Sequence, residues 1–99
     1  MAYRIEYCSD VENHLRVLTV RQQAIVLDAV ERHLTYQPRV ETKNRKPMRP
    51  NPLAPWELRI GNIRVYYDVE EEPTCVVFVR AAGIKHRKQV SIGEQVIEL

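Results

Sequence analysis

Residues 56–67, with the sequence Trp-Glu-Leu-Arg-Ile-Gly-Asn-Ile-Arg-Val-Tyr-Tyr, decide the fold of this chain. Two runs that alternate apolar and polar residues flank Gly61-Asn62, a pair that suits the positive φ angles of a two-residue hairpin turn. The stretch therefore predicts a β-hairpin. Its predicted cross-strand pairs are Ile60 with Ile63, Arg59 with Arg64, Leu58 with Val65, and Glu57 with Tyr66.

The predicted hairpin has one apolar and one basic face, because side chains alternate along a strand. The apolar face carries Leu58, Ile60, Ile63, Val65 and Tyr67. The opposite face, called the basic face below, carries Glu57, Arg59, Arg64 and Tyr66. Two arginines directly opposite each other repel and cost stability. An anion bound between them would reverse that sign, so we interpret the basic face as a binding surface.

The residues before residue 36 predict one strand and two helices. Residues 3–7 alternate and form a short strand. Ser9-Asp10-Val11-Glu12 has the pattern of a capping box and opens a helix that ends near Leu18. A second capping box, Thr19 to Gln22, opens another helix that runs to about Leu34. Helices joined this closely form an antiparallel αα-hairpin, whose apolar side requires a sheet to cover it.

Residues 36–55 hold five of the six prolines of the chain, interleaved with basic residues that include Arg45 and Lys46. Proline restricts the backbone without permitting a helix or a central strand. We expect an extended basic loop across the surface, and loops of this length are usually functional or mobile. The alternative is a solvated connector. Residues 35–64 together contain seven basic and two acidic residues, which indicates one surface that faces a polyanion.

A third strand of the meander is predicted over residues 74–81, after a polar turn at Glu70–Pro73. If Val69 pairs with Cys75, Tyr66 faces Phe78 and Arg64 faces Arg80. That register would place Arg59, Arg64 and Arg80 in one row on the basic face. Gly83 then breaks the strand before a basic turn, Lys85-His86-Arg87-Lys88. Residues 90–97 alternate around Gly93-Glu94 and predict a final small hairpin, with a short terminal helix as the alternative.

Length and composition set the broad class of the protein. Ninety-nine residues suit a single domain over 1–99. No apolar run approaches the roughly 20 residues of a membrane span, and residues 1–10 lack the apolar region of a signal peptide, so we expect a cytoplasmic protein. Cys8 and Cys75 are expected to be buried free thiols. The histidines and cysteines show no metal-ligand spacing, and we expect no metal and no cofactor.

The ordered set of strand, αα-hairpin and antiparallel meander, with Trp-Glu-Leu-Arg at 56–59, Arg-Val-Tyr-Tyr at 64–67 and Gly-x-x-x-Arg at 83–87, resembles the RelE/ParE toxin superfamily. The resemblance covers Tyr3 to about Arg87. It implies an α+β, RelE-like fold in which the helices pack on one sheet face. It also implies the toxin of a type II toxin–antitoxin pair, bound by a cognate protein antitoxin in a hetero-oligomer.

Two activities are known among the proteins that this chain resembles. RelE-like members cut mRNA in the ribosomal decoding site and so inhibit translation, whereas ParE-like members poison DNA gyrase. The basic face favours the first activity, an mRNA interferase whose substrate is mRNA on the ribosome. The alternatives are a ParE-like non-nucleolytic toxin, a catalytically inactive relative that acts by protein binding, and a nucleic-acid-binding module without toxicity. None of these involves a membrane.

The resemblance also assigns roles to residues of the basic face. It implies that Arg64 stabilises the phosphate in the transition state and that Lys85 and Arg87 bind phosphate. Arg59 fits a position that holds RNA in RelE, whereas Glu57 stands where RelE has a lysine. Several active members carry a C-terminal tyrosine on a short helix, and the nearest position here is Ser91.

RNA cleavage requires a base for the 2′-hydroxyl, stabilisation of the phosphorane and a proton for the leaving 5′-oxygen. Guanidinium groups bind phosphate bidentately and stay charged, which suits Arg64 and Arg80. Glu57 is a candidate general base, or it only offsets the repulsion between two arginines. His86 is a candidate general acid, or a phosphate contact. The remaining candidate RNA-binding residues are Arg59, Lys85, Arg87, Lys88, Arg45 and Lys46.

Overall fold

The computed structural model describes residues 2–98 and contains two helices and seven strands within that range. The α+β class and the order of elements agree with the prediction. The elements are β1 (Arg4–Tyr7), α1 (Ser9–Arg16), α2 (Val20–Leu34), β2 (Arg45–Pro47), β3 (Trp56–Ile60), β4 (Ile63–Glu70), β5 (Val76–His86), β6 (Gln89–Ile92) and β7 (Gln95–Glu98).

The predicted hairpin forms the centre of the sheet as β3 and β4. All four predicted cross-strand pairs are present, and Gly61 has a φ of +56° in the turn. Antiparallel neighbours extend the sheet in the order β2-β3-β4-β5-β6-β7. β1 pairs in parallel with the first part of β5. The alternation in residues 56–67 therefore fixed both the turn and the register.

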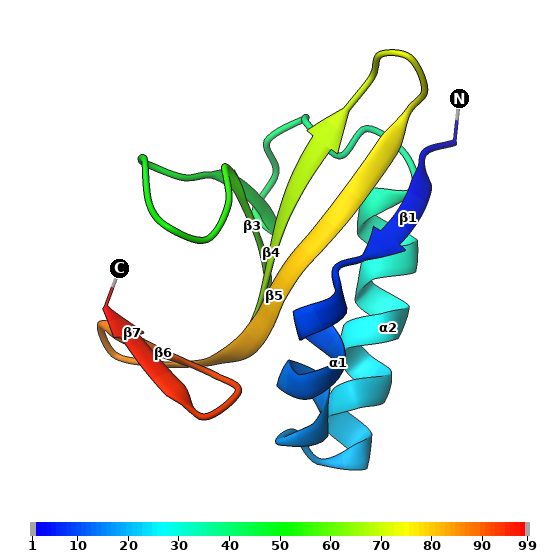
Figure 1. Cartoon of the computed structure of the whole chain (residues 1–99). Helices are drawn as coiled ribbons and strands as arrows, with labels where there is room; N and C mark the ends of the chain where they lie inside the picture. Colours follow the sequence, from blue (N-terminus) through cyan, green and yellow to red (C-terminus); the bar gives the residue numbers. More distant parts are fainter. Residues whose placement is uncertain (1, 99) are drawn as a thin grey trace.

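Both helices cover the same face of the sheet and run antiparallel beside each other (Figure 1). The main core lies between these layers, because the apolar face of the hairpin and the apolar sides of the helices meet there. Its fully buried members include Leu58, Val65 and Tyr67 from the hairpin, Val77 and Val79 from β5, and Val26, Val30 and Leu34 from α2. Within residues 2–98, no helix covers the opposite sheet face, which includes the basic face.

The two predicted helix starts have different outcomes. The capping box of α2 is confirmed, since the Thr19 hydroxyl accepts from the Gln22 backbone N–H and the Gln22 side chain accepts from the Thr19 N–H. The capping box at Ser9 is wrong, because Cys8 is the N-cap and makes no side-chain cap bond. The Cys8 N–H donates to the Val79 carbonyl at 2.9 Å. This bond keeps Cys8 in the extended backbone of the sheet, so Ser9 is already helical.

The predicted register between β4 and β5 is wrong. Arg64 pairs with Gly83 and not with Arg80, and Tyr66 pairs with Ala81. There are two physical reasons. The turn after β4 takes more residues than expected, so that Val69 pairs with Val77, and a bulge at Tyr66/Tyr67 shifts the register once more. Arg59, Arg64 and Arg80 therefore do not form one row.

Gly83 does not break β5, which continues to His86. A Cβ atom at Gly83 would lie 2.1 Å from the Ser91 carbonyl oxygen of β6. The glycine therefore allows a close approach of two strands. The predicted terminal hairpin is present as β6 and β7, and it turns at Gly93 with a φ of +61°. Ser91 lies in β6 and not on a helix.

The segment from 36 to 55 contains no helix, as expected, but it is not extended throughout: it turns at Gln37, which has a φ of +52°, and residues 48–55 fold back into a closed loop. Residues 45–47 add a short edge strand to β3. The last part of the segment, residues 48–55, forms a loop over the uncovered sheet face and packs on a second small core. That core contains Ala54, Tyr66, Ala81, Val90 and Ile92. Cys8 and Cys75 are free thiols, each only partly buried. Between residues 2 and 98, neither helix is long and apolar enough to cross a membrane.

Candidate functional site

A cavity of about 320 Å³ is lined by residues of the basic face and of the segments around it. Four basic side chains and one carboxylate line it, from the loop after β2, from β3, and from the end of β5 and the turn that follows. Its lining residues are Pro47, Met48, Arg49, Glu57, Arg59, Lys85, Lys88 and Val90. We call it the Glu57 cavity, after its one acidic residue.

Glu57, the second residue of β3, lies at the floor of this cavity. It pairs with Tyr66 on one side and with Lys46 on the other, and its side chain is only 4% exposed. Its Oε1 accepts a hydrogen bond of 2.6 Å from Arg59 Nε, and its Oε2 lies 4.0 Å from Arg64 Nε. The carboxylate thus lies within ion-pair distance of both facing arginines, where its charge opposes their repulsion.

Arg59 is the exposed partner of this pair. Its guanidinium uses Nε for Glu57, while its side chain remains 44% exposed. Asn44 fixes the backbone beneath it, because the Arg59 N–H donates to the Asn44 carbonyl and the Asn44 side chain donates to the Arg59 carbonyl, both at 2.8 Å. A fixed backbone and an exposed guanidinium allow Arg59 to bind an anion with little reorganisation.

Arg64 is turned away from the cavity. Its Nη1 donates to the Gly61 carbonyl at 2.7 Å and to the Ile63 carbonyl at 3.0 Å, and its side chain is only 13% exposed. Within residues 2–98, its buried Nε has no hydrogen-bond partner. Arg64 is therefore not among the residues that line the cavity. It stabilises the hairpin turn through the two carbonyls and adds positive charge close to Glu57.

Tyr66 is a fully buried member of the second core, so it packs against its neighbours there and presents no stacking surface to a ligand. Its hydroxyl finds no hydrogen-bond partner among residues 2–98. Burial, followed by the negative charge of Glu57, raises the pKa of Tyr66 far above its ordinary value of 10.0. The phenol therefore stays protonated beside the carboxylate.

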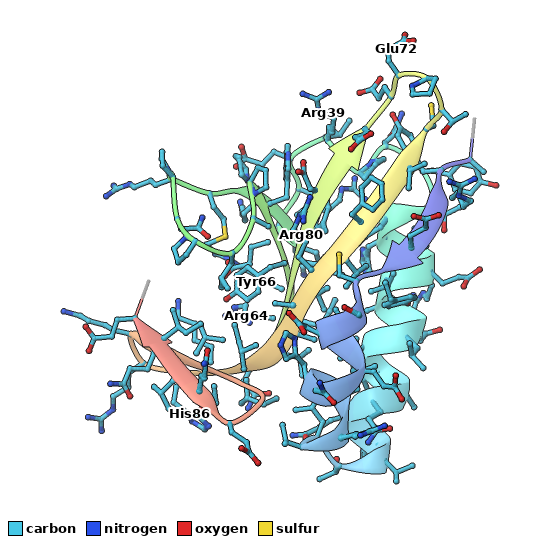
Figure 2. The ribbon with its side chains drawn as sticks, in the orientation of Figure 1. Arg39, Arg64, Tyr66, Glu72, Arg80 and His86 are labelled. Carbon is cyan, nitrogen blue, oxygen red and sulfur yellow. The ribbon has the colours of Figure 1, made fainter. Side chains whose placement is uncertain are left out.

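Other predicted residues fall in three places. Lys85 and Lys88, two of the residues predicted to bind phosphate, line the Glu57 cavity. Lys46 lies next to Glu57 across the sheet and pairs with Glu41 at 3.4 Å. His86 and Arg87 line a different cavity, formed with Gln89 and Glu98. His86 is the last residue of β5, where it pairs with Gln89 of β6, and it is not among the residues that line the Glu57 cavity. Figure 2 shows its label well away from that of Tyr66.

Arg45 and Arg80 also lie outside the Glu57 cavity. Arg45 Nη1 donates to the His33 carbonyl at 2.7 Å and its Nε to the Val40 carbonyl at 2.9 Å, so it fastens the loop to the end of α2. Arg80 pairs with Asp68 at 3.4 Å. Figure 2 shows Arg80 beyond Tyr66 when the sheet is followed from Arg64.

Arg49 is the site residue that was not identified from the sequence. It belongs to the proline-rich basic segment, but that segment offers several cations of equal standing. Only the path of the loop brings Arg49 over β3 and into the Glu57 cavity. The signal in the sequence was its position between Pro47 and Pro50. These prolines predict a loop of restricted conformation, but they do not show which part of the sheet the Arg49 side chain reaches.

Comparisons with known proteins bear on the fold. Neither a family model nor a curated protein matches the sequence. Among solved structures, the chain is similar to a chain of the toxin–antitoxin complex RelBE2 from Mycobacterium tuberculosis. The two share 21% sequence identity and a TM-score of 0.71, over 86% of this chain and 100% of the other. The protein therefore has the fold of a component of that complex, in agreement with the predicted architecture.

Proposed function

We propose that this protein is the toxin of a type II toxin–antitoxin module and cleaves mRNA on the ribosome. The observation that carries the proposal is the Glu57 cavity, where a buried carboxylate lies under four cationic side chains. The shared fold supports it, because the similar chain comes from a toxin–antitoxin complex. A cognate antitoxin would hold the protein inactive in a hetero-oligomer.

The cations of the cavity suit an RNA backbone. Arg49 and Arg59 approach from the loop and from β3, and Lys85 and Lys88 approach from the far side. A phosphate between them gains charge-assisted hydrogen bonds from both sides, and guanidinium groups bind it bidentately. The single carboxylate does not balance four cations, so the cavity attracts an anion.

Glu57 is the candidate general base for the 2′-hydroxyl. Its Oε1 is held by Arg59, which fixes the carboxylate at the floor of the cavity where the phosphate binds. Deprotonated 2′-oxygen then attacks the phosphorus, and Arg59 and Lys85 stabilise the charge of the phosphorane. The bond to the 5′-oxygen breaks, and that oxygen takes a proton from Lys85 or Lys88, which lie in the cavity while His86 does not. The products are a 2′,3′-cyclic phosphate and a 5′-hydroxyl.

The test uses purified protein and mRNA with and without bound ribosomes, and maps the new 5′ ends. We expect cuts within the codon in the decoding site only when ribosomes are present. A parallel assay measures supercoiling by DNA gyrase. Inhibition of gyrase without any cleavage of mRNA would overturn the proposal and support the ParE-like alternative.

A further inference from the structure

A second cavity of about 410 Å³ lies next to the Glu57 cavity on the same sheet face. Its walls are mostly apolar, and its polar side chains are Asn51, Asp68 and Arg80. The full lining is Met48, Pro50, Asn51, Leu53, Ala54, Pro55, Asp68 and Arg80. Met48 lines both cavities, so the two are neighbours. We call it the loop cavity.

The loop that walls this cavity is braced from within. The Met48 N–H donates to the Pro55 carbonyl at 2.8 Å and closes the base of the loop. Asn51 Nδ2 donates to the Arg49 and Ala54 carbonyls at 2.7 and 3.0 Å. Its Oδ1 accepts from the backbone N–H groups of Leu53 and Ala54 at 2.8 and 3.1 Å. Prolines limit the remaining freedom. The cavity is therefore preformed, which lowers the cost of binding.

Asp68 and Arg80 present an acceptor and a donor side by side. Arg80 belongs to the bulged part of β5, between the residues that pair with Tyr66 and Tyr67. Its Nη2 lies 3.4 Å from Asp68 Oδ2, and the two side chains are 43% and 35% exposed. An exposed pair at this distance contributes little to stability. Asp68 Oδ1 also accepts from the Val69 backbone N–H at 2.8 Å. Each carboxylate oxygen has a further lone pair, so both side chains can still bind a ligand.

We propose that the loop cavity binds one base of the RNA and prefers guanine. This inference rests on the proposed function, since it places the base beside a phosphate in the Glu57 cavity. A carboxylate accepts two hydrogen bonds from adjacent donors, and guanine offers them as N1–H and the 2-amino group. Arginine donates to the guanine O6 and N7 acceptors. The apolar side chains of the loop supply the surface against which an unstacked base packs.

The other bases fit this pair less well. Adenine and cytosine each present one amino group beside a ring acceptor, and an acceptor opposite a carboxylate repels it. Uracil presents one N–H between two carbonyl oxygens. Only guanine satisfies both oxygens of Asp68 while it also accepts from Arg80.

The test measures binding without ribosomes, so that its outcome does not depend on cleavage. GMP, IMP, AMP, CMP and UMP are titrated into the ¹⁵N-labelled protein, and the shifts of the Asn51 side-chain amide and the Arg80 guanidinium are followed. IMP is the matched ligand because it lacks only the 2-amino group. We expect GMP to bind about tenfold more tightly than the other four, which is the discrimination that a bidentate contact provides.

Two variants test the two contacts separately. Asp68→Asn should bring GMP to within about twofold of IMP, because it replaces one of the carboxylate acceptors for N1–H and the 2-amino group with an amide donor. Arg80→Gln should weaken GMP and IMP together, because both carry the O6 and N7 acceptors. The control is Asp28→Asn, because Asp28 forms a comparable exposed pair with Arg32 at 3.3 Å on α2, and it should leave the preference unchanged. Equal binding of all five nucleotides, or shifts confined to residues 85–88, would overturn the proposal. A GMP preference in a protein that cuts no mRNA would uphold the base site and refute the nuclease.

Discussion

Glu57→Gln separates the two roles that the structure allows this residue. The substitution keeps the shape of the side chain and its ability to accept a hydrogen bond from Arg59, but it removes the negative charge. If Glu57 is the general base, the charge is needed for the reaction. If Glu57 only offsets the arginines, the charge is needed for stability.

The structure gives the magnitude of both effects. The hydrogen bond from Arg59 Nε is short, at 2.6 Å, and the carboxylate is 4% exposed, so the bond is charge-assisted and shielded. A hydrogen bond to a charged group contributes about 1.5–3 kcal/mol, and glutamine retains part of it. The facing Arg59 and Arg64 then repel without a counter-charge. We expect Glu57→Gln to lower the free energy of unfolding by about 2 kcal/mol.

Glu57→Gln should change the affinity for RNA and the cleavage rate in opposite directions. Loss of a general base lowers the cleavage rate by about 10²- to 10⁴-fold. Loss of the one carboxylate among four cations strengthens RNA binding, because the net charge of the cavity rises. Glu57→Gln should therefore bind RNA at least as tightly as the wild-type protein and cut it far more slowly.

Three measurements on the same preparation test this prediction. Urea unfolding gives the stability, fluorescence anisotropy gives the affinity for a short RNA, and single-turnover cleavage on ribosomes gives the rate. The control is Glu41→Gln, because Glu41 pairs with Lys46 at 3.4 Å but is 57% exposed, and it should change none of the three by much. A Glu57→Gln protein that cuts at the wild-type rate refutes the role as a base. A parallel loss of affinity and rate would show that Glu57 only positions Arg59.

Three further predictions follow from other contacts. Gly83→Ala should lower the free energy of unfolding, measured by urea denaturation, by about 3 kcal/mol, because the new Cβ would lie 2.1 Å from the Ser91 carbonyl oxygen. An unchanged midpoint of the urea unfolding curve would contradict the close approach of β5 and β6. Lys85→Ala should weaken RNA binding and reduce the slope of log affinity against log salt by about 0.7, whereas Arg16→Ala, an exposed cation on α1, should leave the slope unchanged. Burial raises the pKa of Tyr66 and of Tyr67 above their ordinary 10.0, so the unfolded chain loses these protons at a lower pH than the folded protein does. The free energy of unfolding should therefore fall above about pH 10, by about 1.4 kcal/mol per pH unit for each tyrosine. Tyr66→Phe should make that decline less steep, and a wild-type stability that does not change between pH 10 and 11 would refute the linkage.

The central hairpin was predictable because its determinants are local. Gly61-Asn62 specifies the turn, and a two-residue turn fixes every cross-strand pair from Ile60 back to Glu57. Alternation then decides which face each side chain occupies. The contact between Glu57 and Arg59 follows from these two facts, since residues two apart on a strand share a face.

The register of β5 was not predictable in the same way. The turn after Glu70 leaves the pairing of Val69 open, and a bulge inserts one further residue without a glycine or other local signal at Tyr66 and Tyr67. A shift of this kind moves a side chain along the sheet by several ångströms. For that reason Arg80 lies beside Asp68 and not beside Arg64.

The composition of the cavity depended on long-range packing. Lys85 and Lys88 were identified because a basic turn follows the strand. Arg49 and Arg45 come from the same basic segment, yet one lines the cavity and the other binds backbone carbonyls near α2. Charge alone does not distinguish them, because the path of the loop decides which sheet face each residue reaches.

The most direct test of the account is the single-turnover cleavage rate of mRNA bound to ribosomes, for the wild-type protein and for Arg59→Ala. Arg59 is the exposed guanidinium that touches both Glu57 and the cavity. The account predicts cleavage by the wild-type protein and a loss of about 10²-fold in the variant, as expected when an electrostatic contact to the transition state is removed. Equal rates for the two proteins, or no cleavage by the wild-type protein, would contradict it.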